Sequence, residues 1–390
     1  HPNFMTKLKP ISIYIHWPFC LSLCPYCDFN SHVANTIDHA NWLKAYELEL
    51  EYFAPRIQNK EIKSIFFGGG TPSLMQPFVV EAIINKIASL GKMSESCEIT
   101  LEANPTSFET DKFKQFKSAG INRVSIGVQS FNKQDLKTLG RKHSADEAIN
   151  AIKSASEIFE RYSFDLIYAR PSQTLESWQE EMKFALTLAG GHISLYQLTI
   201  EKGTPFFNLF RVGDLSLPSN DLAAELYEWT NSFLGQHGYN RYEISNYSKL
   251  GEECIHNLCY WNYGEYIGIG PGAHSRIHDS GNVHAVMMYH KPDKWLESVF
   301  EQKNGIQNNV KLSKEEIIEE LIMMGTRLSV GVKEDSLHKL LGLGFKDIFN
   351  QDILEYYTEK NLVSVRNGVL KLSDQGLLVH NYLVPRLLKG

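Results

Sequence analysis

The chain has 390 residues, of which 43% are apolar and 22% charged, and its formal net charge is −6. This size favours one large domain and a smaller one, and the composition is typical of a globular protein. The negative charge argues against nucleic acid as a partner. We find no run of about 18 apolar residues and no secretory pattern, so we expect a cytoplasmic protein.

The first predicted strand ends in a loop that carries half of the chain's cysteines. Cys20, Cys24 and Cys27 are separated by three and by two residues. Three thiolates at this spacing can bind one face of an iron–sulfur cube and leave its fourth iron open for chemistry. Two alternatives are ordinary buried cysteines and a zinc site completed by His16 or His32. The close clustering of the thiols favours the iron–sulfur site.

Strand and helix signals alternate through the first half of the chain. Apolar residues at helical spacing predict helices over 38–53, 77–90 and 110–119. Strand-then-helix units imply parallel strands joined by right-handed crossovers. Six such units, rather than eight, predict a partial barrel with its ligand groups at the carboxyl ends of the strands. The predicted strands cover residues 11–17, 62–67, 98–102, 122–130, 163–168 and 192–198.

Polar and glycine residues follow these strands, where parallel strands place an active site. The second strand runs into GGGTPS, whose backbone N–H groups and missing side chains let a polar ligand approach. Glu102 ends the third strand in an EANP segment, and taken alone it suggests an ordinary loop charge. Gln129 can bind hydroxyls. Arg141, expected where a helix begins, opposes the helix dipole there and therefore indicates an anionic ligand.

The second half of the chain is less regular. We predict an amphipathic helix over 219–237, a strand over 239–247, and two helices over 314–328 and 336–341. A hairpin with an Asn-Gly turn and a last helix near Ser373 follow, which is typical of a winged-helix-like domain. Such domains often bind DNA, but the charge does not support that role, so we expect a cap or partner surface. The expected units are 1–205, 206–311 and 312–390.

One string in the second half, CIHNLCYW from Cys254 onward, combines histidine, cysteines and aromatic residues. His256 could be an axial ligand of haem, because imidazole binds haem iron and aromatic rings pack on the macrocycle. The alternative is that His256 and Asn257 bind backbone groups in an aromatic core. Cys259 and Cys254 stay unassigned, and Cys97 is expected to be a small buried hydrophobe.

Together these motifs resemble the radical S-adenosylmethionine (AdoMet) superfamily, and within it the coproporphyrinogen dehydrogenase-like branch. In that superfamily three cysteines bind a [4Fe-4S] cluster, whose fourth iron is chelated by AdoMet. The resemblance implies an α/β fold with a partial (β/α)6 barrel, followed by a small C-terminal winged-helix-like α+β domain. It assigns Cys20, Cys24 and Cys27 to the cluster. It assigns to AdoMet the residues Tyr14, Tyr26, Gly69, Gly70, Thr71, Glu102, Gln129, Arg141, Asp165 and Thr199.

The chain departs from the branch pattern DLIYGLPGQT at three positions after the fifth strand. Ala169, Arg170 and Ser172 stand where the pattern has Gly, Leu and Gly. Because glycine tolerates backbone angles that alanine and serine do not, the conformation of this turn is in doubt. Asp165 itself is retained.

The HNxxYW string distinguishes the haem chaperones of this branch, so the resemblance implies a protein that binds haem through His256 and Asn257 and transfers it. The acceptor protein is unknown, and a membrane-associated respiratory protein is one candidate. The resemblance also implies an electron donor for the cluster and leaves a homodimer open. It assigns no catalytic residue.

The alternative is an oxygen-independent coproporphyrinogen III dehydrogenase, in which a 5′-deoxyadenosyl radical drives oxidative decarboxylation of propionates. The cysteine pattern of those enzymes is CxxxCxxCxC, whereas this chain has Phe29 in place of the last cysteine. They also carry an N-terminal arm, for which too few residues precede the first strand here. A vestigial cluster on an interaction scaffold is a third alternative, which the intact AdoMet motifs disfavour.

Overall fold

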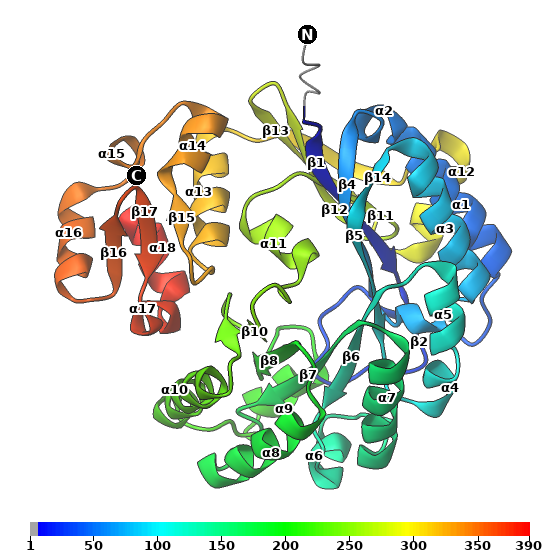
Figure 1. The fold of residues 1–390 in the computed structure, drawn as a ribbon, viewed down its shortest axis with the longest axis horizontal. Helices are drawn as coiled ribbons and strands as arrows, with labels where there is room; N and C mark the ends of the chain where they lie inside the picture. The colour runs from blue at the N-terminus through cyan, green and yellow to red at the C-terminus, as the bar shows by residue number, and fades with distance from the viewer. Residues whose placement is uncertain (1–6) are drawn as a thin grey trace.

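The computed structural model describes residues 7–390 and is built on a strongly curved sheet (Figure 1). Six neighbouring strands pair in parallel, in the order in which they occur in the chain, as the partial barrel predicted. The expectation of an N-terminal segment too short for an arm rests partly on residues 1–6, which lie outside the described residues. The six strands are β1 (Lys9–Trp17), β4 (Lys60–Gly69), β5 (Lys92–Ala103), β6 (Arg123–Gln129), β7 (Arg161–Tyr168) and β8 (His192–Gln197).

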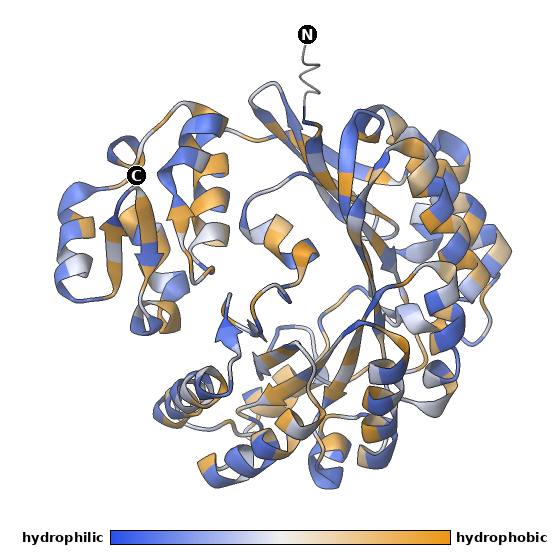
Figure 2. Ribbon diagram, in the orientation of Figure 1, coloured by the Kyte–Doolittle hydropathy of each residue, from blue (hydrophilic) through white to orange (hydrophobic). Residues whose placement is uncertain are grey.

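Helices cover the outer face of these strands (Figure 1). In α3, the buried positions recur on one side of the helix, from Val79 to Ile87, and pack on the sheet. Figure 2 shows the same mixture of hydrophobic and hydrophilic residues on the other outer helices. The covering helices are α1 (His39–Tyr52), α2 (Ala54–Ile57), η1 (Pro72–Leu74), α3 (Pro77–Leu90), α4 (Ser107–Thr110), α5 (Phe113–Ala119), α6 (Lys133–Thr138), α7 (Ala145–Ile158), α8 (Leu175–Leu188) and α9 (Pro205–Arg211).

One helix start differs from its prediction. Arg141 lies in the loop between α6 and α7, because a capping box at Ser144 starts α7 three residues further along the chain. The expectation that Arg141 opens a helix is therefore wrong, and its conflict with a helix dipole does not exist. The predicted helix over 110–119 is divided into α4 and α5.

Residues 206–311 extend the sheet at both edges. β11 (Tyr266–Ile269) pairs in parallel with β1, and the antiparallel strands β12, β13 and β14 continue from it. At the other edge β10 pairs antiparallel with β8, and β9 pairs antiparallel with β10 after a turn. The prediction of one continuous strand over 239–247 is therefore wrong. The elements are α10 (Asn220–Gln236), β9 (Asn240–Arg241), β10 (Asn246–Ser248), α11 (Ile255–Trp261), β12 (His274–Asp279), β13 (Asn282–Met288), α12 (Pro292–Gln302) and β14 (Ile306–Lys311).

The C-terminal domain has its own core and a three-stranded antiparallel sheet in the order β15-β17-β16, as expected of a winged-helix-like unit. Asn367 and Gly368 both have positive φ, which the tight turn of the predicted hairpin requires. Tyr263 and Val283 of the preceding region join this core. The elements are α13 (Lys314–Gly325), β15 (Val332–Lys333), α14 (Glu334–Leu341), α15 (Phe345–Ile348), α16 (Gln351–Glu359), β16 (Val363–Arg366), β17 (Val369–Leu372), α17 (Asp374–Leu378) and α18 (His380–Leu387).

Helix α11 lies inside the curve of the sheet, between the parallel strands and the C-terminal domain (Figure 1). It contains the whole HNxxYW string and contacts β4 on one side and α13 on the other. Helical structure at this string was not expected from the sequence. None of the helices described in residues 7–390 is long and apolar enough to cross a membrane.

Candidate cluster and cofactor site

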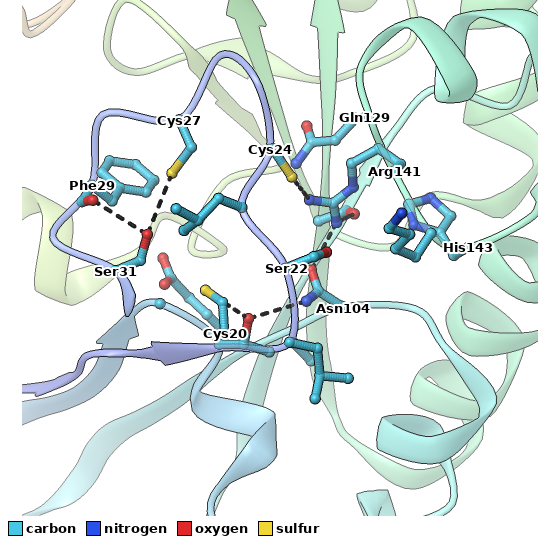
Figure 3. A pocket seen from close by; sticks show the side chains of 18 of the residues that line it. Cys20, Ser22, Cys24, Cys27, Phe29, Ser31, Asn104, Gln129, Arg141 and His143 are labelled. Carbon is cyan, nitrogen blue, oxygen red and sulfur yellow. Dashed lines mark hydrogen bonds between the residues drawn. The ribbon is translucent and has the colours of Figure 1, made fainter. Parts of the chain in front are cut away.

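The cysteine loop, residues 20–31, lies over the carboxyl ends of the parallel strands and closes one side of a cavity of about 190 Å³. Figure 3 shows the three cysteine side chains around this cavity, with Gln129 and Arg141 beside Cys24 and across from Cys20 and Cys27. The short strands β2 (Phe19–Cys20) and β3 (His32–Val33) pair at the base of the loop. The predicted site residues that line the cavity are Cys20, Cys24, Tyr26, Cys27, Gly69, Gly70, Thr71, Glu102, Gln129, Arg141 and Asp165.

Each thiol has a polar neighbour. Thr71 Oγ1 donates to Cys20 Sγ at 3.4 Å, and Arg141 Nη1 donates to Cys24 Sγ at 3.4 Å. Cys27 Sγ lies 4.0 Å from the hydroxyl of Ser31. Burial raises the pKa of Cys20 and of Cys27, and these hydrogen bonds oppose that rise. The donors are therefore placed to stabilise thiolates, the form that binds iron.

The alternative of a zinc site completed by histidine has no support in this geometry. His16 Nε2 bonds the backbone oxygen of Asn30 at 2.8 Å, and its Nδ1 bonds Tyr14 OH at 3.0 Å. His32 Nε2 bonds Asn30 Oδ1 at 2.9 Å. Within residues 7–390, no three His, Cys, Asp or Glu side chains are arranged to hold a single metal ion.

The glycine turn is attached directly to the start of the cysteine loop. The N–H of Gly70 donates to Trp17 O at 2.6 Å, and the N–H of Thr71 donates to Phe19 O at 2.8 Å. Gly69 has φ +116, and a Cβ added to it would lie 2.6 Å from Trp17 O. A Cβ on Gly70 would lie 2.7 Å from Phe19 O. Side chains at these positions would separate the turn from the loop, which explains why the sequence has glycine here.

Asn104 connects the two sides of the cavity, a role that the sequence analysis missed. Its Nδ2 donates to Thr71 Oγ1 at 3.2 Å, and its Oδ1 accepts from Arg141 Nη2 at 2.7 Å. Arg141 Nη2 also donates to Gly127 O at 2.7 Å. Asn104 belongs to the EANP segment, for which the sequence predicted a role only for the carboxylate of Glu102.

Two half-buried carboxyl groups face the same cavity. Burial, and next the charge of Asp165, raises the pKa of Glu102 to about 8, although the N–H of Gly69 donates to Glu102 Oε2 at 3.3 Å. Burial raises the pKa of Asp165 to about 6. Carboxyl groups in this state favour a cationic ligand or hydroxyl donors, because either would offset the cost of ionising them.

Two further polar atoms of the cavity residues have no partner. Gln129 Oε1 and Arg141 Nε are buried and form no hydrogen bond within residues 7–390. Gln129 is also held at φ +70, a conformation that is strained for a residue with a side chain. Unsatisfied buried groups of this kind indicate a polar ligand that completes them.

Three residues predicted to bind AdoMet lie at different places relative to the first cavity. Tyr26 lines the cavity beside Arg141. Tyr14 lies next to Glu102 but lines a second cavity. Thr199 is exposed, bonds Glu201 and is not part of the cavity. The roles of Tyr14, Tyr26 and Thr199 toward AdoMet stay predictions.

The turn over residues 169–172, where the chain departs from the branch pattern, keeps left-handed backbone angles. Ala169 has φ +56 and Ser172 has φ +62. Arg170 is buried, and its guanidinium pairs with Glu181 at 2.9 Å and Asp135 at 3.3 Å. The conformation is thus kept at the cost of local strain.

His256 is 1% exposed, and both of its ring nitrogens have partners. Nδ1 lies 2.8 Å from Ser64 Oγ, and Nε2 lies 2.7 Å from Tyr260 OH. Burial lowers the pKa of His256 to about 3, so its ring is neutral. Asn257 is half-buried beside it on α11. In this conformation His256 supports the helix from inside and has no nitrogen free for iron.

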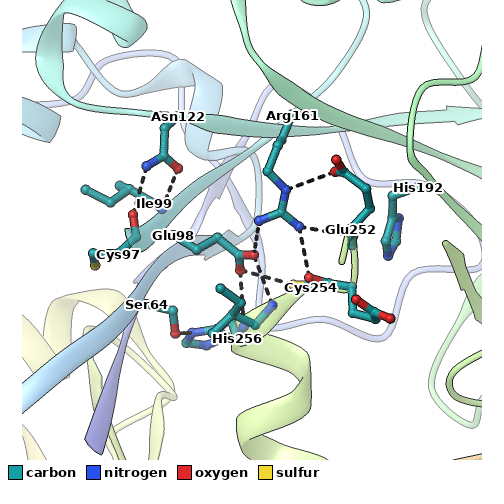
Figure 4. Close-up of polar contacts among 12 residues, drawn as sticks. Ser64, Cys97, Glu98, Ile99, Asn122, Arg161, His192, Glu252, Cys254 and His256 are labelled. Carbon is teal, nitrogen blue, oxygen red and sulfur yellow. Dashed lines mark hydrogen bonds and ion pairs between the residues drawn. The ribbon is translucent and has the colours of Figure 1, made fainter. Parts of the chain in front are cut away.

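The carboxylate of Glu98 caps the first turn of α11 (Figure 4). It accepts from the N–H of Ile255 at 3.0 Å and of His256 at 3.1 Å, and it pairs with Arg161 Nη1 at 2.7 Å. Burial would raise the pKa of Glu98, but Arg123, Arg161 and these N–H groups together hold it below its usual range. The position of α11 therefore depends on an ionised carboxylate from β5.

The remaining cysteines belong to this interior. Burial raises the pKa of Cys254 and of Cys97 to about 12 and that of Cys259 to about 11. Cys254 Sγ donates to Glu98 at 3.4 Å, and Cys259 Sγ donates to Glu265 O at 3.5 Å. All three are protonated structural groups rather than metal ligands.

Comparison with known proteins agrees with this site and fold. Residues 14–185 match the Radical SAM superfamily, and residues 312–379 match the HemN C-terminal domain. "Heme chaperone HemW" from Haemophilus influenzae is 35% identical over 98% of this chain and 99% of its own length. "Heme chaperone HemW" from Bacillus subtilis is 34% identical over 95% and 97%, respectively.

A mitochondrial relative and a solved structure extend the comparison. "Radical S-adenosyl methionine domain-containing protein 1, mitochondrial" from Mus musculus is 36% identical over 97% of this chain and 87% of its own length. The structure entitled "Coproporphyrinogen III oxidase (HemN) from Escherichia coli is a Radical SAM enzyme" superimposes with a TM-score of 0.82, at 22% identity, over 97% of this chain and 90% of that one. This structural likeness confirms the fold.

The chain belongs to the radical AdoMet superfamily, within the group that contains the HemW proteins. Membership implies a [4Fe-4S] cluster and AdoMet, and the residues present fit both groups. Three thiols with polar neighbours suit the cluster. The glycine turn, the carboxyls and the unsatisfied Gln129 oxygen suit a ligand with an amino group and hydroxyls, and the unsatisfied Arg141 Nε–H suits its carboxylate.

Proposed function

We propose that this protein binds haem and transfers it to an acceptor protein, with a [4Fe-4S] cluster and exchangeable AdoMet in the first cavity. The relatives named heme chaperones, matched over nearly their whole lengths, support this proposal. The bound cofactors would supply the capacity for one-electron chemistry. An acceptor protein, an electron donor for the cluster and a homodimer are part of the proposal. The cytoplasmic location stays a prediction, since some relatives are named mitochondrial.

The observation that carries the proposal is Phe29. Its side chain is 69% exposed at the edge of the first cavity, where the dehydrogenase pattern has a further cysteine. A phenyl ring neither binds iron nor transfers protons or electrons, so a chemical step that uses that thiol is not available.

The roles of the chain's own residues follow from the geometry. Cys20, Cys24 and Cys27 would hold three irons, and Thr71 and Arg141 would stabilise the thiolates. The open side of the glycine turn would receive the amino group of AdoMet, and Glu102 would balance its positive charge. Gln129 would bind the ribose hydroxyls through its unsatisfied oxygen.

The second candidate is oxygen-independent coproporphyrinogen III dehydrogenase. The specific observation in its favour is the fold shared with the Escherichia coli enzyme at a TM-score of 0.82. Fold alone is weak support for an activity, because one fold carries many functions.

An anaerobic assay separates the two functions. Cluster-reconstituted protein is incubated with AdoMet, a reductant and coproporphyrinogen III, and haem loading and transfer to an apo-haem protein are followed in parallel. We expect haem binding and transfer without protoporphyrinogen. The Phe29→Cys variant is the matched control, which restores the dehydrogenase cysteine pattern. Protoporphyrinogen formation by the wild-type protein would establish the enzyme and overturn the proposal.

A further inference from the structure

A second cavity, of about 350 Å³, lies between strands β1, β11 and β12 of the sheet and the C-terminal domain. This volume is within the range of about 300 to 1,000 Å³ typical of small-molecule sites. The two cavities come close to each other at Gly68, where an added Cβ would lie 3.0 Å from Tyr14 of the second cavity and 3.1 Å from Glu102 of the first. Its walls come from four separate parts of the chain: β1, helix α11 with the following turn, β11 with β12, and α13.

Aromatic side chains dominate these walls. Tyr260 and Trp261 of the HNxxYW string face it together with Tyr14, Tyr263 and Tyr266. Tyr260 and Tyr266 pack edge to face with ring centroids 4.6 Å apart. Flat aromatic walls of this kind suit a flat, mostly apolar ring system such as a porphyrin.

Of the two histidines that line this cavity within the described residues, His16 and His274, only His274 has ring nitrogens free for a ligand. His16 and His256 use both ring nitrogens in hydrogen bonds inside the protein. His274, at the start of β12, is exposed and lines the cavity. Neither of its ring nitrogens forms a hydrogen bond within the described part of the chain.

The cavity also offers donors for carboxylates. Arg276 directs Nε to both oxygens of Glu320 and Nη1 to Ser275 O, and its Nη2 has no partner within residues 7–390. The indole N–H of Trp261 is buried and likewise unpartnered among those residues. A buried donor without a partner, here the Trp261 indole N–H, indicates a ligand with acceptor groups, such as the propionates of haem.

We propose that haem occupies this second cavity, with His274 as its iron ligand and Arg276 as a propionate partner. The inference rests on the proposed function, and it names an iron ligand for haem in place of His256, the histidine of the HNxxYW string. His256 then acts indirectly: with Ser64 and Tyr260 it holds the helix that carries the aromatic wall. Met324 lines the cavity as well, and its thioether is available on the C-terminal domain.

The test is a titration of the full-length protein with ferric haem, followed by difference absorption and electron paramagnetic resonance. We expect one haem per chain with a nitrogen ligand in the wild-type protein. The His274→Ala variant should bind haem with an affinity lowered at least about ten-fold, and its spectrum should lack the nitrogen ligand. Added imidazole should restore the wild-type spectrum. His274→Cys should give a thiolate-ligated spectrum, which a merely structural role of His274 would not produce. Unchanged cluster content and AdoMet binding would show that the variants are folded.

His256→Gln is the matched control, because an amide can keep hydrogen bonds with Ser64 and Tyr260 but is not an expected iron ligand. We expect this variant to keep the wild-type ligand spectrum. A wild-type spectrum in His274→Ala, or loss of the nitrogen ligand in His256→Gln alone, would overturn the assignment of the site and leave the proposed function intact. Absence of haem binding by the wild-type protein would overturn both.

Discussion

The two cavities share no lining residue and differ in the chemistry of their walls. The first is lined by thiols, half-buried carboxyl groups and backbone N–H groups at the ends of parallel strands. The second is lined by four tyrosines and a tryptophan, together with two histidines, the Arg276–Glu320 pair and small residues. A polar, charge-selective cavity suits a small ionic cofactor, whereas an aromatic cavity suits a large flat ligand. The contrast assigns cofactor and cargo to different places in one fold.

The largest expected effect separates the cavities through the cysteines. Cys20→Ala, Cys24→Ala or Cys27→Ala should each abolish the cluster, because two thiolates cannot hold the cube, while haem binding in the second cavity persists. Iron content and the broad visible absorbance of the cluster measure the first effect, and haem titration measures the second. Cys97→Ala is the control, because Cys97 lies outside both cavities. A full four-iron cluster in any of the three variants would contradict the site.

The second effect is on α11 and the aromatic wall. Glu98→Ala leaves Arg161 and Arg123 without their buried carboxylate and should lower the free energy of unfolding by about 3–5 kcal/mol. Haem binding should fall with it. Glu252→Ala is the matched control: Glu252 pairs with the same Arg161, but its side chain is 38% exposed, so we expect a loss of about 1 kcal/mol or less. Chemical denaturation of the two variants measures the difference, and equal losses would contradict the capping role.

The same carboxylate gives the stability a pH dependence. The pKa of Glu98 is lower in the folded state than in the unfolded state. The ionised carboxylate therefore stabilises the fold at pH values above its unfolded pKa of about 4.3, and this stabilisation is lost as the pH falls through its folded pKa. The wild-type protein should therefore lose stability on acidification more steeply than Glu98→Gln. Melting temperatures between neutral and acidic pH test this, and parallel curves would exclude the contribution.

A smaller effect is expected within the first cavity. Arg141→Ala removes the donor to Cys24, Asn104 and Gly127 and should weaken AdoMet binding about ten-fold without loss of the cluster. Arg141→Lys keeps the charge but not the planar fork and should lie between the two. Calorimetric titration with AdoMet measures the effect. An unchanged affinity in Arg141→Ala would mean that this residue does not act on the cofactor.

The smallest effect concerns the strained turn beside the first cavity. Ala169→Gly and Ser172→Gly relieve positive φ angles and should each stabilise the protein, by up to about 1 kcal/mol once the greater freedom of unfolded glycine is subtracted. Ala189→Gly is the control, because Ala189 has φ −67 and glycine there should destabilise. Thermal unfolding compares the three variants. Destabilisation at 169 and 172 as well would show that the turn is not strained.

The first cavity was predictable and the second was not, for a physical reason. Short contiguous motifs at the ends of parallel strands are brought together by strand order alone, so the cysteines, Gly69, Gln129 and Arg141 meet as expected. The second cavity needs β11 to pair beside β1 and the C-terminal domain to pack against α11, contacts that no local pattern encodes. For the same reason the sequence suggested His256 as a ligand, while its burial became visible only in the fold.

The relation between the cavities is tested most directly by one calorimetric measurement: AdoMet titrated into cluster-loaded protein, with and without one equivalent of bound haem. The account predicts that haem leaves one AdoMet site per chain and does not compete for it, because each ligand has its own cavity. An apparent AdoMet affinity that falls in proportion to added haem would place both ligands in the same cavity and contradict the account.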